Sequence, residues 1–251
     1  MSERHRLRSV LRLAYMNGIV PMRTQPMFLV SVLASPLSFL FFVTIASGGT
    51  LLPYGIAGGM VLTVLSVGTS LQTDMSHYRT DLKFQDVLVA SPVEAPVYVV
   101  GIALSELLYS LPGLAVFILL WGFDPRLSHI TALGALIAFG VLFTVWAFAS
   151  ALGFMMATFF ADIRETFVFS SLVSLGLSVL PPVYYPIQAI PAAFRWLAYL
   201  SPTTYAAILM QAAFGLQSIS LVSGVIDWLA LIAAAGILLV VAAFKARWRD
   251  A

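Results

Sequence analysis

Several long apolar runs constrain the fold of this chain more than any other feature of its sequence. They approach the length of about 20 residues that a helix needs to cross about 30 Å of hydrocarbon. Only 10% of the 251 residues are charged, whereas a soluble domain carries about 25%. A soluble protein with a very apolar core is therefore rejected. We predict an all-α membrane protein that crosses the bilayer several times.

Hydropathy predicts six membrane-spanning helices, of which the fifth is cut short. Pro181 and Pro182 end it, because proline lacks the backbone N–H and its ring clashes with the preceding helical turn. The whole chain, residues 1–251, is predicted to form one transmembrane domain. The six predicted spans cover 27–47, 54–73, 97–121, 130–160, the segment from Thr166 to the two prolines, and 225–244.

The basic residues indicate how these helices are oriented. With both termini in the cytoplasm, the inner segments hold all of the 13 Lys and Arg residues except Arg126 and Arg195. Such a bias marks the cytoplasmic side of a membrane protein. A seventh span at 202–216 is rejected, since it would place one terminal basic cluster outside and is shorter than the usual span of about 20 residues. We therefore expect a multi-pass protein of the cytoplasmic membrane.

The N-terminal segment, residues 1–25, is predicted to lie on the membrane surface. A basic row of Arg4, Arg8 and Arg12 runs beside an apolar stripe on a helix over residues 4–16. This pattern is typical of a helix that lies flat on an anionic membrane face and contacts its lipids. A basic tail without that contact is the alternative. The stripe consists of Leu7, Val10, Leu11, Ala14 and Tyr15.

The longest cytoplasmic loop, residues 74–97, concentrates charge in a chain that otherwise avoids it. Residues 80–90 are predicted to form a short helix that exposes both charged and apolar side chains. Such a helix favours a docking surface for a partner over a solvated loop. Ser91, Pro92 and Glu94 match a capping box that would begin the third span. The charged residues of the loop are Asp74, Arg79, Asp81, Lys83, Asp86 and Glu94.

The segment 183–224 is predicted to be an outer re-entrant hairpin, whose apolar helices enter the membrane only partway. The stretch LPPVYYPIQAIP, residues 180–191, opens it with four prolines. Non-helical backbone at membrane depth is tolerated only where protein or a water-filled cavity surrounds it. Its aromatic residues favour an interfacial belt, with stacking on sugar rings as the alternative. They are Tyr184, Tyr185, Phe194, Trp196, Tyr199 and Tyr205.

Motifs for catalysis are absent from the sequence. A phosphate-binding loop needs a Lys followed by Ser or Thr, whereas Lys83 precedes Phe84 and Lys245 precedes Ala246. The chain has no cysteine, and its three histidines, His5, His77 and His129, lie in predicted tails or loops without metal-ligand spacing. We therefore expect neither an enzyme nor a metal site.

Glu106 is the one acidic residue well inside a predicted span. An ion-coupled secondary transporter could use it as a proton or substrate site. We prefer a paired or water-facing carboxylate in the cytoplasmic third of the bundle. A six-span protein without an energy site most simply takes its energy from a partner. A membrane scaffold or assembly factor is the third alternative.

The order of these features resembles a known family. A basic N-terminal helix, two spans and a cytoplasmic helix lead into LVASPVEAPVYVVG, and a Gly- and Ala-rich fourth span follows. The fifth span then runs through LPPVYYPIQAIP to LSPTTY. This arrangement is similar to the membrane (permease) subunit of type-2 ATP-binding-cassette (ABC) exporters, among them the daunorubicin-resistance, nodulation-factor and polysaccharide-export permeases. The resemblance covers nearly the whole chain.

The resemblance implies two separate ATPase subunits, which bind ATP and Mg²⁺, and a second permease copy that is identical or similar. It implies no nucleic acid partner and no cofactor in this chain. The segment 183–224 would help to close the outer side of the pathway, with an outer gate at Pro181, Pro182, Tyr184, Tyr185 and Pro186. The ATPase would contact a coupling helix through Thr80, Asp81, Lys83, Phe84, Gln85, Asp86, Leu88 and Val89.

The near absence of charge from the predicted spans favours a hydrophobic or amphipathic substrate. A drug, a lipid and a lipid-linked glycan all satisfy this condition, and the sequence does not separate them.

Overall fold

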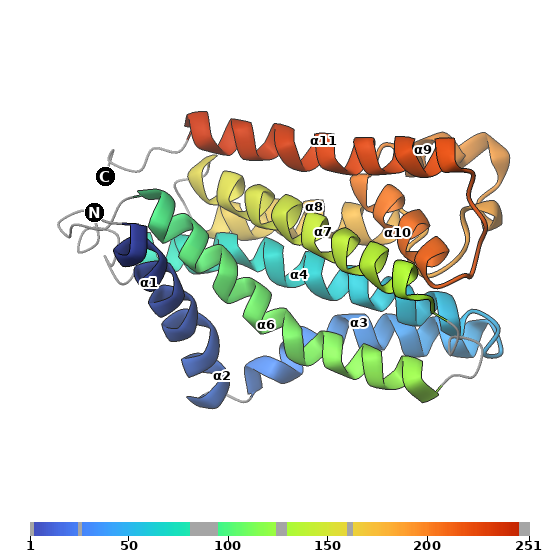
Figure 1. Cartoon of the computed structure of the whole chain (residues 1–251), viewed down its shortest axis with the longest axis horizontal. Coiled ribbons are helices and arrows are strands. Elements are labelled where there is room, and N and C mark those ends of the chain that lie inside the picture. The colour runs from blue at the N-terminus through green and yellow to red at the C-terminus, as the bar shows by residue number, and fades with distance from the viewer. Residues whose placement is uncertain (1–2, 25–26, 81–94, 124–129, 160–162, 246–251) are drawn as a thin grey trace.

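The structure is a computed structural model that describes residues 3–24, 27–80, 95–123, 130–159 and 163–245. These residues form helices and turns, with no strand among them. The long helices run roughly along the longest axis of the molecule (Figure 1). They are α3 (Met27–Ala46), α4 (Leu52–Thr80), α6 (Ala95–Phe123), α7 (Ala132–Phe159), α8 (Ile163–Val179) and α11 (Leu221–Lys245).

Helix α4 forms the core of the bundle and runs through its middle in Figure 1. It packs against α3, α6, α7 and α8. Small residues let its neighbours approach closely, as small residues do in membrane bundles. A Cβ added at Gly59 would lie 2.1 Å from the ring of Phe117 on α6, and one at Gly68 would lie 2.6 Å from Ala149 on α7. At these glycines the side chains of α6 and α7 therefore lie directly against the backbone of α4.

Four described helices are long and apolar enough to cross a membrane, which confirms a multi-pass helical protein. Helix α3 contributes a shorter apolar segment, Pro36–Ala46, and α8 has 17 residues. The count of six spans stays a prediction, although a helix stands at each predicted position. The four candidate spans are Leu52–His77, Val97–Phe123, Ala132–Phe159 and Leu221–Ala242.

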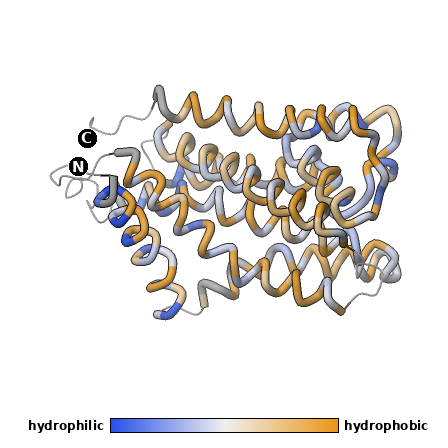
Figure 2. Tube along the Cα trace, in the orientation of Figure 1, coloured by the Kyte–Doolittle hydropathy of each residue, from blue (hydrophilic) through white to orange (hydrophobic). Residues whose placement is uncertain are grey.

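Large apolar side chains cover the outside of the bundle. Figure 2 shows hydrophobic residues along the whole length of the long helices, and a concentration of hydrophilic residues on α1. A soluble monomer rarely exposes apolar patches of this extent. Examples with more than half of their surface exposed are Phe41 and Phe42 on α3, Leu136 and Phe139 on α7, Leu172 on α8 and Leu229 on α11.

The helices place the predicted cytoplasmic segments at one end of the bundle. The start of α1 (Glu3–Ala14), the end of α4, the start of α6 and the end of α11 all lie there (Figure 1). The turn between α3 and α4 and the short helices that follow α8 lie at the opposite end. An even number of membrane crossings between α1 and α11 would place both on the same side of the membrane, which is consistent with this arrangement.

The second predicted span ends too early. Helix α4 continues past residue 73 to Thr80, so Asp74 and His77 belong to a helix and not to a loop. His5 lies in α1, within the helix that the sequence predicts over residues 4–16. Hydropathy shows only where the apolar residues of a span stop. The helix itself continues, because buried polar residues such as Gln72 and Ser76 pack against the neighbouring helices. The predicted capping box at 91–94 lies outside the described residues.

The N-terminal helix packs against the bundle as well as exposing apolar residues. Helix α1 continues through η1 (Tyr15–Ile19) into α2 (Val20–Thr24), and both α1 and η1 contact α6. A Cβ added at Gly101 would lie 2.8 Å from Leu13, and Ala14 is buried. Leu7, Leu11 and Tyr15 of the predicted stripe are exposed. The stripe therefore divides between a face on α6 and a face that stays available to the membrane.

Candidate functional site

The first part of the proline break, residues 180–191, is buried, whereas Gln188, Ala189 and Pro191 at its far end are exposed. Helix α8 ends at Val179, and Pro181, Pro182 and Val183 are buried. The break packs directly on α4, because a Cβ added at Gly58 would lie 2.1 Å from the carbonyl oxygen of Val183. Protein thus surrounds the non-helical backbone at residues 181–184, as its expected membrane depth requires.

Gln211 supplies hydrogen bonds that the proline break lacks. Its Nε2 donates to the carbonyl oxygen of Pro182 at 3.1 Å and to that of Tyr185 at 3.2 Å. Gln211 is 1% exposed and belongs to α10 (Pro202–Ala213), which packs against α4, α7 and α11. Buried carbonyls without partners are costly, so this side chain stabilises the break. The sequence prediction missed Gln211, whose only signal is an amide within an apolar run.

Tyr184 connects the proline break to α3. Its hydroxyl donates to the carbonyl oxygen of Pro36 at 3.4 Å, and its ring stacks on Phe39 with the ring centres 5.5 Å apart. Burial raises the pKa of the Tyr184 phenol above its ordinary value, so the hydroxyl remains a donor at physiological pH. Tyr184 is therefore a packing residue and no member of an exposed belt. Phe194, Trp196 and Tyr199 are exposed, as a belt requires.

Short helices follow the break and lead into α10. They are η3 (Ile187–Ala189), η4 (Ala192–Phe194) and α9 (Arg195–Tyr199). Arg195 donates from Nε to the carbonyl oxygen of Ile190 at 2.9 Å and from a terminal nitrogen to that of Gln188 at 3.1 Å. Arg195, one of the two predicted outer arginines, thus stabilises the turn at residues 188–195 within the segment 183–224. The remaining predicted gate residues, Tyr185 and Pro186, are half-buried.

Glu106 is 1% exposed and paired with side chains of α4. The Ser70 hydroxyl donates to Oε2 of Glu106 at 3.0 Å. The carboxyl group of Asp74, one helical turn after Ser70, lies near that of Glu106. The paired or water-facing carboxylate stays a prediction, and Asp74, which the sequence analysis placed in a loop, lies on α4. We call Asp74 and Glu106 the carboxyl pair.

Two further polar contacts join helices at this depth of the bundle. The Gln72 side chain of α4 donates from Nε2 to the hydroxyl of Ser170 on α8. The indole N–H of Trp146 on α7 donates to the carbonyl oxygen of Ala103 on α6 at 2.8 Å. The few polar groups of the helices therefore fix neighbouring helices to one another.

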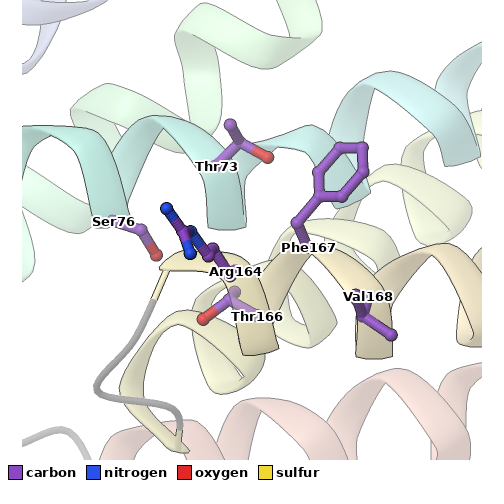
Figure 3. A pocket seen from close by; sticks show the side chains of 6 residues that line it. All are labelled: Thr73, Ser76, Arg164, Thr166, Phe167 and Val168. Carbon is purple, nitrogen blue, oxygen red and sulfur yellow. The ribbon is translucent and has the colours of Figure 1, made fainter.

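Two cavities lie between α4 and α8. The first, of about 340 Å³, has Arg164 of α8 directed toward α4, with apolar side chains beside it (Figure 3). It is lined by Thr73, Ser76, Arg164, Thr166, Phe167 and Val168. The second, of about 260 Å³, also reaches α3 and is lined by Phe39, Leu65, Ser66, Thr69, Ser171, Ser174, Leu175 and Ser178. Both cavities combine hydroxyl groups with apolar walls.

Most of the predicted ATPase contact lies outside the described residues. This applies to Asp81, Lys83, Phe84, Gln85, Asp86, Leu88 and Val89. Thr80 is the last residue of α4, and its side chain is likewise outside the description, as is that of Arg4. Arg8 and Arg12 are exposed on α1. Within the described ranges, no group of His, Asp and Glu residues is arranged to hold a metal ion.

A comparison with protein families decides what kind of bundle this is. The model of the ABC-2 type transporter family matches residues 16–214, from η1 to the residue that follows α10. The chain belongs to the ABC-2 type transporter family. It is therefore a transport component of an ABC transporter, multi-pass in the membrane and not itself catalytic, and its family implies an ATPase partner. A search of curated proteins found no match.

The family match covers most of the features described for this ABC-2 protein, although the predicted interfacial residues Arg4, Arg8 and Arg12 lie before it. The proline break, Gln211 and the carboxyl pair all lie within residues 16–214. Helix α11 follows the matched region and packs against α7 and α10. The structural features described above therefore belong to the transporter domain itself.

Proposed function

We propose that this chain is the permease subunit of an exporter that moves a hydrophobic or amphipathic substrate across the cytoplasmic membrane. Separate ATPase subunits bind ATP and Mg²⁺ and supply the energy. The family match over residues 16–214 carries this proposal. Both chain termini are cytoplasmic, in keeping with the Lys and Arg bias and with the common end of α1 and α11 in Figure 1.

Residues 80–89, which we call the coupling segment, receive the ATPase. The segment begins at the last residue of α4, and α6 begins a few residues after it. Helix α4 contacts α3, α6, α7, α8 and α10, so a displacement of its cytoplasmic end reaches most of the bundle. Helix α1 packs against α6 and gives the ATPase a second route of contact. ATP binding closes the ATPase subunits, and the docked segments transmit that movement.

The proline break serves as part of the outer gate. It rests on α4 at Gly58, is held by Gln211 of α10 and is joined to α3 through Tyr184. A rotation or shift of α4 would disturb the close contact between Gly58 and Val183. The gate thus responds to the same helix that leaves the membrane at the coupling segment. Hydrolysis and release of the ATPase subunits restore the closed packing.

The two cavities between α4 and α8 support an amphipathic substrate. The hydroxyls of Ser66, Ser171 and Ser178 donate within their own helices, at 2.7, 2.8 and 2.7 Å, and keep their lone pairs available as acceptors. Arg164 adds a cationic group beside Phe167. A substrate with a polar part and an apolar part finds both kinds of contact here. A drug, a lipid and a lipid-linked glycan remain the candidates.

A second permease copy completes the pathway. Helix α8 buries one face, at Thr166, Ser170 and partly at Val173 and Leu177, and exposes apolar residues such as Leu172 on another. A second copy that faces the cavity between α3, α4 and α8 would enclose it. We propose a homodimer, with two ATPase subunits bound at the cytoplasmic end.

Purification from the native membrane tests this assignment. A tag on the permease is expected to recover an ATPase subunit with the ABC nucleotide-binding motifs. Substitution of Asp86 by Ala is expected to weaken that recovery, while the matched change Gln188→Ala, in the exposed outer segment, leaves it unchanged. Recovery of the permease without any ATPase, under conditions that preserve other complexes, would contradict the assignment.

An ion-coupled transporter that uses Glu106 is the second candidate. The observation that favours it is the burial of Glu106 beside a second carboxyl group. It requires transport by the chain alone under an ion gradient, so the two candidates differ in their need for an ATPase.

A further inference from the structure

We propose that the two cavities between α4 and α8 are consecutive compartments of one substrate path, and that the hydrogen bond from Gln72 to Ser170 closes the path between them. A substrate passes this point by replacing that bond with neutral O–H or N–H groups of its own, so Gln72 determines specificity. The proposal rests on the proposed function for the direction and energy of transport. The barrier between the cavities is a property of this chain alone.

One face of each helix lines both cavities. On α4 the lining residues recur every three or four positions, which is the spacing of side chains on one helical face. On α8 the same spacing continues from Phe167 to Ser178. Helices α4 and α8 are in contact, so the two lined faces form one seam. The lining residues on α4 are Leu65, Ser66 and Thr69 in the second cavity and Thr73 and Ser76 in the first.

Gln72 and Ser170 stand between the two cavities on their respective helices. Along α4, Gln72 lies between Thr69 of the second cavity and Thr73 of the first. Along α8, Ser170 takes the same place between the lining residues of the two cavities. The Gln72 side chain donates to the Ser170 hydroxyl, and the two residues are only 5% and 3% exposed. Their contact therefore closes the seam between the cavities.

The hydrogen bonds at this contact leave one acceptor of Gln72 for a substrate. The Ser170 hydroxyl donates to the carbonyl oxygen of Phe167 at 3.1 Å, so its oxygen accepts from Nε2 of Gln72. Among the described residues, no N–H or O–H group donates to the buried Oε1 of Gln72. A buried acceptor without a donor is costly, and a substrate O–H or N–H group that reaches it removes that cost. The contact can thus be exchanged for a substrate that carries such a donor.

The second cavity favours a neutral polar group. The described residues that line it include five hydroxyl side chains and no ionisable one, whereas Arg164 lines the first cavity. An ionic group that passed Gln72 would enter an uncharged space with apolar walls, where charge is costly. Hydroxyl or amide groups would find hydrogen-bond partners there. The path therefore selects substrates whose polar part carries O–H or N–H groups without charge.

The barrier is tested by cysteine labelling of the chain without an ATPase. The sequence has no cysteine, so Thr73→Cys and Ser174→Cys report the first and the second cavity separately. With an impermeant thiol reagent on the cytoplasmic side, position 73 should react much faster than position 174. Gln72→Ala should raise the rate at position 174 to that at position 73. The control Trp146→Phe removes a hydrogen bond between α7 and α6, outside the seam, and should leave both rates unchanged.

Equal rates at the two positions in the chain that keeps Gln72 would overturn the barrier. So would an unchanged rate at position 174 in Gln72→Ala, or a rise of the same size in Trp146→Phe. If Gln72→Ala does not fold, Ser170→Ala removes the acceptor from the other side of the contact and should have the same effect. Failure to find an ATPase partner would contradict the proposed function, whereas these rates would still decide whether Gln72 closes the path.

The specificity of Gln72 is tested with a neutral alkyl glycoside and its fully O-methylated counterpart, which lacks the O–H donors. The measured quantity is the concentration of each compound that half-maximally stimulates ATP hydrolysis by the complex in lipid nanodiscs. The glycoside should act at a concentration lower by roughly five- to hundredfold. Gln72→Leu should abolish this difference, because leucine offers no acceptor. A purely structural defect would weaken both compounds alike, so an unchanged ratio of the two concentrations in Gln72→Leu would overturn the specificity role.

Discussion

The carbonyl oxygen of Val183 lies so close to Gly58 that an added Cβ would sit 2.1 Å from it. This contact joins the proline break to α4, the central helix of the bundle. A side chain at position 58 would fit only if the backbone at Val183 moved away. The proline break and α4, which leads into the proposed coupling segment, are thus in close backbone contact.

Gly58→Ala is expected to destabilise the protein. Overpacking of this kind costs typically about 1–3 kcal/mol, and here the obstructing atom belongs to backbone that cannot swing aside. Thermal unfolding in detergent should show a lowered midpoint. Gly236→Ala on α11 is the control, since nothing lies within 4 Å of its added Cβ. Alanine in a helix should leave that variant as stable or slightly more stable. Equal midpoints for the two variants would refute the close contact.

Gln211→Leu should also destabilise the proline break. It removes the donor to the carbonyls of Pro182 and Tyr185, and a buried group left without a partner costs about 1–3 kcal/mol. The matched control is Gln217→Leu, where a half-buried amide donates to one carbonyl, that of Ile208, at 3.1 Å. Faster hydrogen exchange across 180–191 in the Gln211 variant alone is the expected result, and an unchanged rate would count against its role.

Neither the role of Gln211 nor the position of Asp74 near Glu106 could be predicted from local sequence patterns. Hydropathy and prolines predicted a helix at each of the long-helix positions, and the end of α8 before Pro181 follows from proline chemistry. Gln211 acts on residues 29 and 26 positions away, and Asp74 meets Glu106 only because α4 and α6 pack together. Contacts between segments distant in sequence leave no periodic signal. The same applies to Gly58, whose need for a small residue is set by Val183.

Phe84→Ala and Asp86→Ala in the coupling segment are expected to lower ATPase stimulation and transport together. Phe84 would lose an apolar contact with the ATPase and Asp86 a charged one, while membrane insertion depends on neither residue. Insertion and permease recovery, measured in the same membranes, should equal those of the unmodified chain. Transport at the original rate in both variants would place the ATPase contact elsewhere.

The topology predicts labelling of a cysteine at Gln188 from the outer side only. The chain has no cysteine of its own, and Gln188 is exposed, so an impermeant thiol reagent reports one position. A cysteine at Arg12, exposed on α1, should react only when the cytoplasmic side is accessible. Labelling of position 188 from the cytoplasmic side alone would contradict the six-span arrangement.

Transport in vesicles tests the central claim most directly. The permease is reconstituted with and without its partner ATPase, and movement of a fluorescent amphipathic substrate is followed with ATP or with an ion gradient. We predict transport only when the ATPase and hydrolysable ATP are both present, and none with a non-hydrolysable analogue beyond a single turnover. Transport by the permease alone under a proton or sodium gradient would contradict the account.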